Sequence, residues 1–419
     1  MINYIINFLL RDSSLSKFVG YCTKEHCDEY KVIIVPSGFF DSDAYGTRKS
    51  LPKLPIAKLE NTSVLFGKPL IERVNDTIVC HSDIIAASFF VLSRYEEYVS
   101  PNTNLDIHGR YIGKSSFASH AGYLAHPIVD EYSDFLRNLL TTAGVDVAPI
   151  SSKPKIYLTH DVDTLSLYRR LRGALGGALR SIKGSDTDSF SSIFKSIKNI
   201  ENDPAFTFNK LIKADKKIPD AEIIYFIKAA KKVKGFDYPG YSLTDKDFNY
   251  FLNKISDNNT HPGLHTSYQS GKDTSLINFE LNKLQSALNQ TIRYNRWHYL
   301  RIPEPTEMEI LFENGITDDF SVCYADMVAY RLGTTRAVNY INPKTKQISN
   351  LILHPLSIMD ATLSNYMELN IEEAFDICKK TINTIKYHKG DICLLWHNTS
   401  LNPKSYHEEL YNKVINELL

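Results

Sequence analysis

From about residue 155 to the end of the chain, short apolar runs alternate with segments in which apolar residues recur at helical spacing. Short runs rich in β-branched and aromatic residues predict strands. These runs cover residues 156–163, 222–227, 263–268, 291–294, 352–353 and 392–396. The segments with helical spacing cover residues 245–255, 307–314 and 372–387. This alternation is typical of a parallel α/β sheet, either open or closed into a barrel.

The first 150 residues carry a less regular mixture of strand and helix patterns. Residues 31–35 are strand-like and stop at a turn, and residues 83–99 show helical spacing after Ser82, a suitable N-cap. Residues 1–10 predict a first strand or helix. Because 419 residues exceed the usual size of one hydrophobic core, we place a boundary at the polar segment 151–154. We expect an accessory α/β domain at residues 1–150 and a larger α/β domain at residues 151–419.

Ionisable side chains follow several of the predicted strands directly. They are Asp161, Asp163, His265, His298, Arg301 and His397. In parallel α/β folds the carboxyl ends of the strands meet at one edge, where sites are built. Successive side chains of a strand point to opposite faces, so Asp161 and Asp163 should lie on the same side. One such residue alone is more often structural than functional, but their joint placement predicts an enzyme.

Carboxylates and imidazoles that arrive from separate strands are suitable ligands for a divalent metal with an open position for water. Such a metal lowers the pKa of its water from 15.7 to about 7. One aspartate would then bind the metal, and the other would accept the proton of the water. A histidine on the opposite wall would protonate a departing amine or alkoxide.

Composition and charge narrow the class of protein. Lys plus Arg and Asp plus Glu both number 48, so no overall charge favours nucleic acid, and we expect none as a partner. We expect no transmembrane segment, because no apolar run approaches roughly 20 residues, and no signal peptide.

Six scattered cysteines, of which only Cys22 and Cys27 are close, indicate thiols in a reducing cytoplasm. The basic residues at 168–183 are either a solvated helix face or a surface for an anionic substrate, a sugar nucleotide or a membrane.

Four segments, at residues 158–163, 263–268, 301–303 and 394–398, together resemble the ordered motifs of the polysaccharide deacetylases, the NodB-homology group of carbohydrate esterases. Residues 93–98 and 108–110 resemble segments of a bacterial subgroup with an extra N-terminal α/β domain. The resemblance implies a distorted (β/α) barrel with a metal at the C-terminal ends of the strands. It also implies hydrolysis of an N-acetyl group on an amino sugar that is carried by a nucleotide or belongs to a polysaccharide or lipid-linked precursor.

The resemblance also implies a role for five residues. Asp161 matches the general base, and Asp163 matches the carboxylate that binds the divalent metal, with zinc expected. His265 matches the first metal histidine. Arg301 matches the arginine that orients the base, and His397 matches the general acid.

One position departs from the family pattern. The second metal histidine should stand four residues after His265, but Gln269 is found there. An amide oxygen is a weaker zinc ligand than an imidazole. His261 could replace it if its loop folds back, because Pro262 excludes a helical pairing of the two histidines. His298 and His354 are further candidates. The alternative function is a non-catalytic carbohydrate-binding or scaffolding protein that has lost the metal, and a small non-sugar amide remains another substrate class.

Two further acidic residues each allow two interpretations. Asp360 ends an apolar stretch, so it either orients a catalytic group or caps a helix. Asp326, together with residues 330–334, either binds substrate hydroxyls or a phosphate, or belongs to a structural loop.

Overall fold

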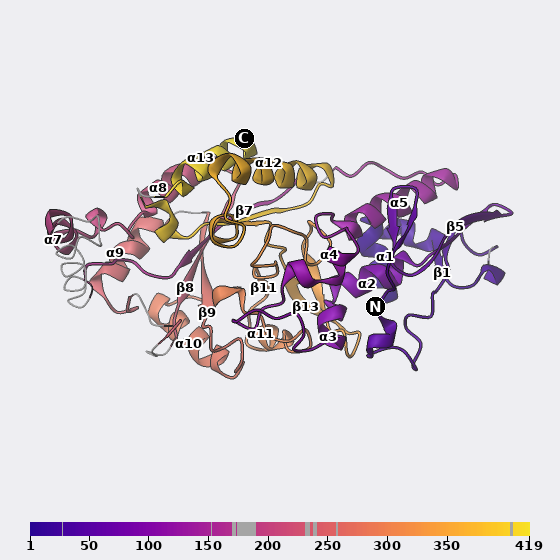
Figure 1. The fold of residues 1–419 in the computed structure, drawn as a ribbon, viewed down its shortest axis with the longest axis horizontal. Coiled ribbons are helices and arrows are strands. Elements are labelled where there is room, and N and C mark those ends of the chain that lie inside the picture. Colours follow the sequence, from indigo (N-terminus) through magenta and orange to yellow (C-terminus); the bar gives the residue numbers. More distant parts are fainter. Residues whose placement is uncertain are drawn as a thin grey trace.

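Two β-sheets follow one another along the chain and lie at different positions along the long axis of the molecule (Figure 1). The computed structural model describes residues 1–26, 28–151, 153–169, 173, 190–230, 235–237, 241–256, 259–402 and 405–419. We refer to residues 1–150 as the N-terminal part and to residues 151–419 as the C-terminal part. A division into two domains at this point remains our proposal.

The N-terminal part is built around a four-stranded sheet with the strand order β1-β2-β6-β5. Strand β5 runs antiparallel to β6, and the other neighbours are parallel. The strands are β1 (Val19–Tyr21), β2 (Val32–Ile34), β5 (Gly67–Val74), β6 (Thr77–Ser82) and a separate antiparallel pair, β3 (Ala57–Leu59) and β4 (Thr62–Val64). The helices are α1 (Ile2–Leu10), α2 (Ile84–Leu92), α3 (Tyr95–Val99), α4 (Phe117–His120) and α5 (Ile128–Thr142).

The single helix that residues 83–99 predict is divided in two. Asp83, rather than Ser82, caps α2, because its side chain accepts a hydrogen bond from the backbone N–H of Ala86 (2.9 Å). Every residue of α2 is buried. Arg94 adopts the left-handed conformation (φ 55°), which ends α2 and lets α3 begin in a new direction.

The C-terminal part contains a nine-stranded sheet with the order β12-β13-β11-β10-β9-β8-β7-β15-β14. Strand β12 is antiparallel to its neighbour, and all other pairs are parallel. The strands are β7 (Ile156–Val162), β8 (Glu222–Lys228), β9 (Thr260–Thr266), β10 (Tyr294–Trp297), β11 (Asp318–Asp319), β12 (Val338–Ile341), β13 (Ile348–Leu353), β14 (Ile358–Met359) and β15 (Ile392–Leu395). The expected α/β class is confirmed.

The large sheet is curled rather than flat. Strands β7 and β11 are four strand spacings apart in the sheet order, which is about 19 Å in a flat sheet. The centroid of the Tyr157 ring on β7 nevertheless lies 5.2 Å from the centroid of the Phe320 ring, and Phe320 directly follows β11. Apolar side chains such as Phe226, Met359 and Leu395 belong to the same buried cluster. The sheet therefore encloses a core of its own and is barrel-like, with β12 and β14 at its two ends.

The C-terminal part also contains helices between and after these strands. They are α7 (Phe190–Lys198), α8 (Phe208–Asp215), α9 (Lys246–Ile255), α10 (Leu276–Leu288), α11 (Glu309–Glu313), α12 (Ile371–Tyr387) and α13 (His407–Leu418). Helix α12 begins with a capping box formed by Asn370 and Glu373, close to the predicted start at residue 372. In Figure 1, α12 and α13 run together along the upper edge of the view.

Two further features concern membrane-spanning helices and cysteines. Among the described helices, none combines the length and the apolar character needed to cross a membrane. The five cysteines that the structure describes are free thiols, and Cys27 lies outside the described residues.

Buried ion pairs join the two parts. Glu97 of α3 binds both Arg94, which directly precedes this helix, and Arg331 of the C-terminal part, whose Nη2 lies 2.8 Å from the carboxylate. Asp130 of α5 binds Arg336 (2.8 Å) in the same way. Burial alone would raise the pKa of Glu97, but the two guanidinium groups outweigh it and hold this pKa at about 2. The N-terminal part is thus fixed to the barrel-like sheet by paired charges.

Candidate metal and catalytic site

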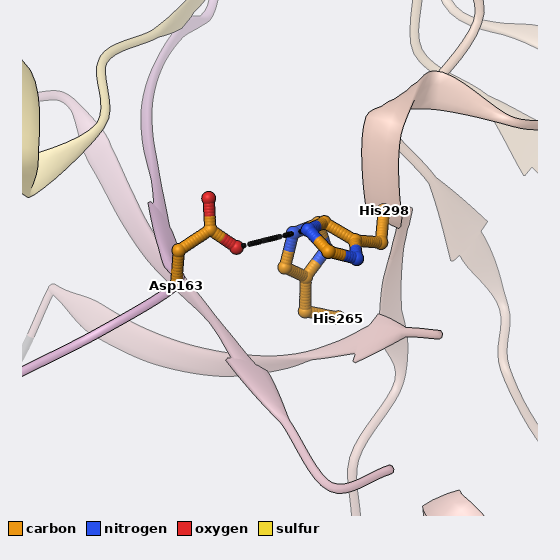
Figure 2. A group of neighbouring side chains, drawn as sticks. All are labelled: Asp163, His265 and His298. Carbon is orange, nitrogen blue, oxygen red and sulfur yellow. Dashed lines mark ion pairs between the residues drawn. The ribbon is translucent and has the colours of Figure 1, made fainter. Parts of the chain in front are cut away.

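Asp163, His265 and His298 meet at the C-terminal ends of three parallel strands of the large sheet. Asp163 directly follows β7, His265 lies near the end of β9, and His298 directly follows β10. One ligand atom from each residue lies within 4.8 Å of the others, so this group could hold a metal ion. Figure 2 shows the Asp163 carboxylate facing both imidazole rings. The sequence placed all three residues at strand ends, but it did not single out His298 as the partner of the other two.

In each histidine one ring nitrogen has a partner outside the group, and the other nitrogen faces Asp163. His265 Nδ1 donates to the backbone carbonyl of Arg296 (2.9 Å), so in the neutral imidazole Nε2 is the nitrogen with a lone pair. This Nε2 is buried, has no hydrogen-bond partner among the described residues, and lies 3.6 Å from Asp163 Oδ1. His298 Nδ1 contacts the carboxylate of Asp237 (3.1 Å), and its Nε2 lies 3.2 Å from Asp163 Oδ1. Such contacts at the second ring nitrogen are typical of metal-binding histidines, so the residues fit a metal ion.

The charges around Asp163 keep it ionised. Loss of solvent would raise its pKa, but Lys228 and His298 outweigh this effect and hold the pKa of Asp163 well below its usual range. Lys228 Nζ lies 3.2 Å from Asp163 Oδ1. Burial lowers the pKa of His298, but the Asp163 carboxylate outweighs burial and raises it overall. A metal at this position would therefore bind next to one ammonium group.

Asp161 lies beside the metal group, on the same side of β7 as Asp163. Its Oδ2 is 3.5 Å from His265 Nε2, and its Oδ1 is 3.6 Å from Arg296 Nη1. Oδ1 is buried and accepts no hydrogen bond from the described residues. His160, the residue before Asp161, points the other way and contacts Asp215 (3.2 Å), as the alternation of side chains predicts.

The arginine beside Asp161 is Arg296, not Arg301. Arg296 is fully buried, donates to Thr159 Oγ1 (3.0 Å) and stacks on the ring of Phe226. Arg301 instead donates to the backbone carbonyl of Tyr268 (3.0 Å) and lies over its ring (4.2 Å). The sequence pattern did not indicate Arg296, because the predicted strand covers residues 291–294 and therefore ends before this residue. In the structure β10 starts only at Tyr294 and contains Arg296.

His397 reaches the same site from the far side. It follows β15, and its Nε2 lies 3.9 Å from Asp161 Oδ2 and 4.0 Å from Asp163 Oδ2. Its Nδ1 and its backbone N–H both contact the buried carboxylate of Asp360, each at 2.8 Å. Burial lowers the pKa of His397, but Asp360 outweighs it and raises this pKa to about 10. Asp360 therefore orients the imidazole, which is the first of the two interpretations of this residue, and keeps it protonated.

The other residues that the sequence suggested lie away from the metal group. Gln269 is exposed, and its backbone N–H donates to Asp237 (3.0 Å). His261 stands at the opposite end of β9 from His265, beside the ring of Tyr294. His354 pairs with Asp318 (2.8 Å). The geometry thus brings His298 to Asp163 and His265, because β10 is the neighbour of β9 in the sheet, and Gln269 and His261 as ligands stay predictions.

Two further sequence suggestions are placed outside the site. Asp326 accepts hydrogen bonds from the backbone N–H groups of Gly113 and Lys114, so it anchors a loop of the N-terminal part. The basic stretch at 168–183 falls mostly outside the described residues; Arg169, which is described, pairs with Asp247 (2.6 Å).

A cavity of about 700 Å³ opens over these side chains. Its size is within the range of small-molecule sites. Asp161, Asp163, His298 and His397 line its floor, together with Lys228. The remaining walls include one side chain from the N-terminal part, which is Arg110, and the rings of Phe236, Tyr299 and Tyr366.

Comparisons with known proteins give few matches. Residues 7–144 match the model of a family of unknown function, DUF7033. Comparison with curated proteins gave no match. Among solved structures, one described as "Crystal structure of putative polysaccharide deacetylase from Mycobacterium smegmatis" is similar at 11% sequence identity and a TM-score of 0.39. The similarity covers 65% of this chain and 86% of that chain. It is too distant to carry an argument about the site.

Proposed function

We propose that the protein is a metal-dependent hydrolase that removes the N-acetyl group from an amino sugar. The observation that carries this proposal is the group of Asp163, His265 and His298, in which His265 Nε2 is buried and has no hydrogen-bond partner among the described residues. Asp161 and His397 stand on either side of the same space. One imidazole pair with one carboxylate is a ligand set that catalytic zinc sites use, so we propose zinc as the metal.

Two other side chains of the site, Asp161 and His397, would each carry out one proton transfer. A divalent metal held by the three ligands would polarise the acetyl carbonyl and acidify a water molecule. Asp161 accepts the proton of the attacking water, and Arg296 holds its carboxylate beside the metal ligands. His397, kept protonated by Asp360, donates its proton to the departing amine nitrogen. The raised pKa of His397 supports this role, since an acid must still carry its proton at neutral pH.

The nature of the substrate rests on the motif resemblance and on the cavity. An acetylated sugar fits within about 700 Å³, and we propose that the sugar is carried by a nucleotide or belongs to a polysaccharide precursor. We further propose a fold of the NodB-homology type, an accessory domain at residues 1–150, and a location in the cytoplasm.

A second candidate is supported by Lys228. Its ammonium group lies 3.2 Å from Asp163 Oδ1, so it could neutralise this carboxylate without a metal. A protein in this state would bind carbohydrate in the cavity without hydrolysing it. The unpartnered His265 Nε2 favours the metal, because an ammonium group at Asp163 does not satisfy that nitrogen.

Acetate release tests the proposal. The substrates are N-acetylated amino sugars in free, nucleotide-linked and oligomeric form, assayed with and without added Zn²⁺. We expect metal-dependent release that falls by about 10²-fold or more in Asp161→Asn and in His397→Ala. His261→Ala, which changes a histidine outside the site, should retain the wild-type rate. Equal rates in the wild type, Asp161→Asn and His397→Ala would contradict the assigned roles.

A further inference from the structure

A loop of the N-terminal part, residues 105–111, reaches the candidate site. An isolated bridge between Leu105 and Tyr111 closes this loop. Within it, Asp106 accepts hydrogen bonds from the backbone N–H groups of His108 (2.8 Å) and Arg110 (2.9 Å). The loop is thus held in one conformation by its own aspartate, and it presents Arg110 to the cavity.

Arg110 uses its donors on three different segments. Nε donates to Asp106 (2.7 Å) in its own loop, Nη1 donates to the backbone carbonyl of Tyr299 (3.1 Å), and Nη2 donates to the hydroxyl of Tyr366 (2.9 Å). The guanidinium group also lies over the Tyr366 ring. The side chain is almost fully buried, with 6% of the residue exposed. A planar guanidinium spreads its donors in fixed directions over several atoms, whereas the donors of a lysine all lie on one nitrogen.

The segment that Arg110 holds is the one that directly follows a proposed metal ligand. Tyr299 (φ 61°) and Leu300 (φ 53°), both in the left-handed region, come immediately after His298. Non-glycine residues adopt this conformation only when the surroundings enforce it, and such residues cluster at functional sites. The ring of His108 packs against the ring of Tyr299 (5.0 Å between centroids), so the same loop contacts this turn twice.

We propose that Arg110 is a positioning residue of the metal site and that the N-terminal part thereby forms a functional component of that site. Arg110 fixes the strained turn at Tyr299 and, through it, the direction in which His298 presents its Nε2 to Asp163. It also ties Tyr366, on the opposite cavity wall, to the same turn. This inference rests on the proposed function, because it requires that His298 binds a metal.

Metal binding by the full-length protein tests this role. The probe is Co²⁺, whose affinity is measured by chelator competition and whose visible absorption spectrum reports the ligand geometry. The variants are Arg110→Met, which removes all three hydrogen bonds, and Arg110→Lys, which keeps the charge but not the three contacts. Arg94→Met is the matched control, because Arg94 is another buried arginine of the N-terminal part, bound to Glu97 and to the carbonyl of Pro303, away from the cavity.

We expect Arg110→Met and Arg110→Lys to weaken Co²⁺ binding by about tenfold or more and to change its spectrum, as loss of an outer contact to a metal ligand does. Arg94→Met should lower the thermal midpoint but leave the affinity and the spectrum unchanged. Wild-type binding and spectrum in both Arg110 variants would overturn the role of Arg110 alone. If Arg110→Met does not fold and Arg110→Lys does, the Co²⁺ spectrum of Arg110→Lys alone tests the role: a changed spectrum supports it, and a wild-type spectrum overturns it. No Co²⁺ binding by the wild type would overturn the proposed function and this inference together.

Discussion

Glu97 offers a quantitative test of how the two parts are held together. Its carboxylate accepts hydrogen bonds from Arg331 Nε (2.9 Å) and Nη2 (2.8 Å) and from Arg94 Nε (3.1 Å), with 11% of the side chain exposed. Burial raises the pKa of Glu97, but the guanidinium groups outweigh it and lower the pKa from 4.5 to about 2. At about 1.4 kcal/mol per pKa unit, the charged form of Glu97 contributes about 3 kcal/mol to the free energy of unfolding.

The sign of the pH dependence follows from the direction of this shift. The folded-state pKa lies below the unfolded-state value, so the contribution is complete above about pH 4.5 and is lost as the pH falls towards 2. Glu97→Gln should therefore be about 3 kcal/mol less stable than the wild type at pH 7. The difference should shrink progressively below pH 4.5.

Urea unfolding followed by tryptophan fluorescence measures this difference. Both tryptophans, Trp297 and Trp396, are buried in the C-terminal part and report its unfolding. The control is Glu409→Gln, since Glu409 is 65% exposed and its pair with Lys413 should contribute less than about 0.5 kcal/mol. A difference below about 1 kcal/mol between Glu97→Gln and the wild type at pH 7, or one that is undiminished at pH 3, would refute the reasoning.

Two further predictions concern catalysis. Arg296→Met should reduce the kcat of acetate release by about 10²-fold, because Asp161 loses its guanidinium neighbour. Arg301→Met should reduce kcat less, because Arg301 contacts Tyr268 instead. Circular dichroism checks that both variants fold. The reverse order would support Arg301 as the orienting residue. Asp360→Asn should lower the pKa of His397, which Asp360 raises to about 10 against the effect of burial, so the alkaline limb of the kcat profile moves to lower pH. An unchanged alkaline limb would exclude His397 as the acid.

The parts of the fold that the sequence predicts best are the strands with continuous apolar runs. Strands β7, β8 and β15 are largely buried on both faces, so each contains a continuous apolar run that ends visibly at polar residues. Helix α12 is equally clear, because its amphipathic pattern and its cap are both local signals. The apolar runs of β7 and β15 are by themselves enough to place Asp161, Asp163 and His397 at strand ends.

Other elements depend on contacts that no local pattern shows. Strand β10 contains Asn295 and Arg296, whose burial is possible only because Asp319 and Thr159 pair with them from other strands. The first half of strand β9 contains His261, Pro262 and Gly263, a poor strand sequence on propensity alone. An added Cβ at Gly263 would lie 2.5 Å from the ring of Phe226, so the packing of the neighbouring strand requires glycine there.

The ligand set is harder to predict than the fold for the same reason. Spacing along the chain directs attention to Gln269 and His261, on either side of His265. The structure places His298, from the neighbouring strand, beside Asp163 and His265, and Arg110 lines the cavity from another part of the chain altogether. Such partners are set by the sheet order and by the contact between the two parts.

Metal content is the most direct test of the proposed function. The purified protein is equilibrated with Zn²⁺, dialysed and analysed by elemental mass spectrometry, together with His298→Ala, His265→Ala and the controls His261→Ala and Gln269→Ala. We predict one equivalent of zinc in the wild type and in both controls, and loss of that zinc in His298→Ala and His265→Ala. A wild-type protein without stoichiometric metal, or zinc that depends on Gln269 and not on His298, would contradict the account.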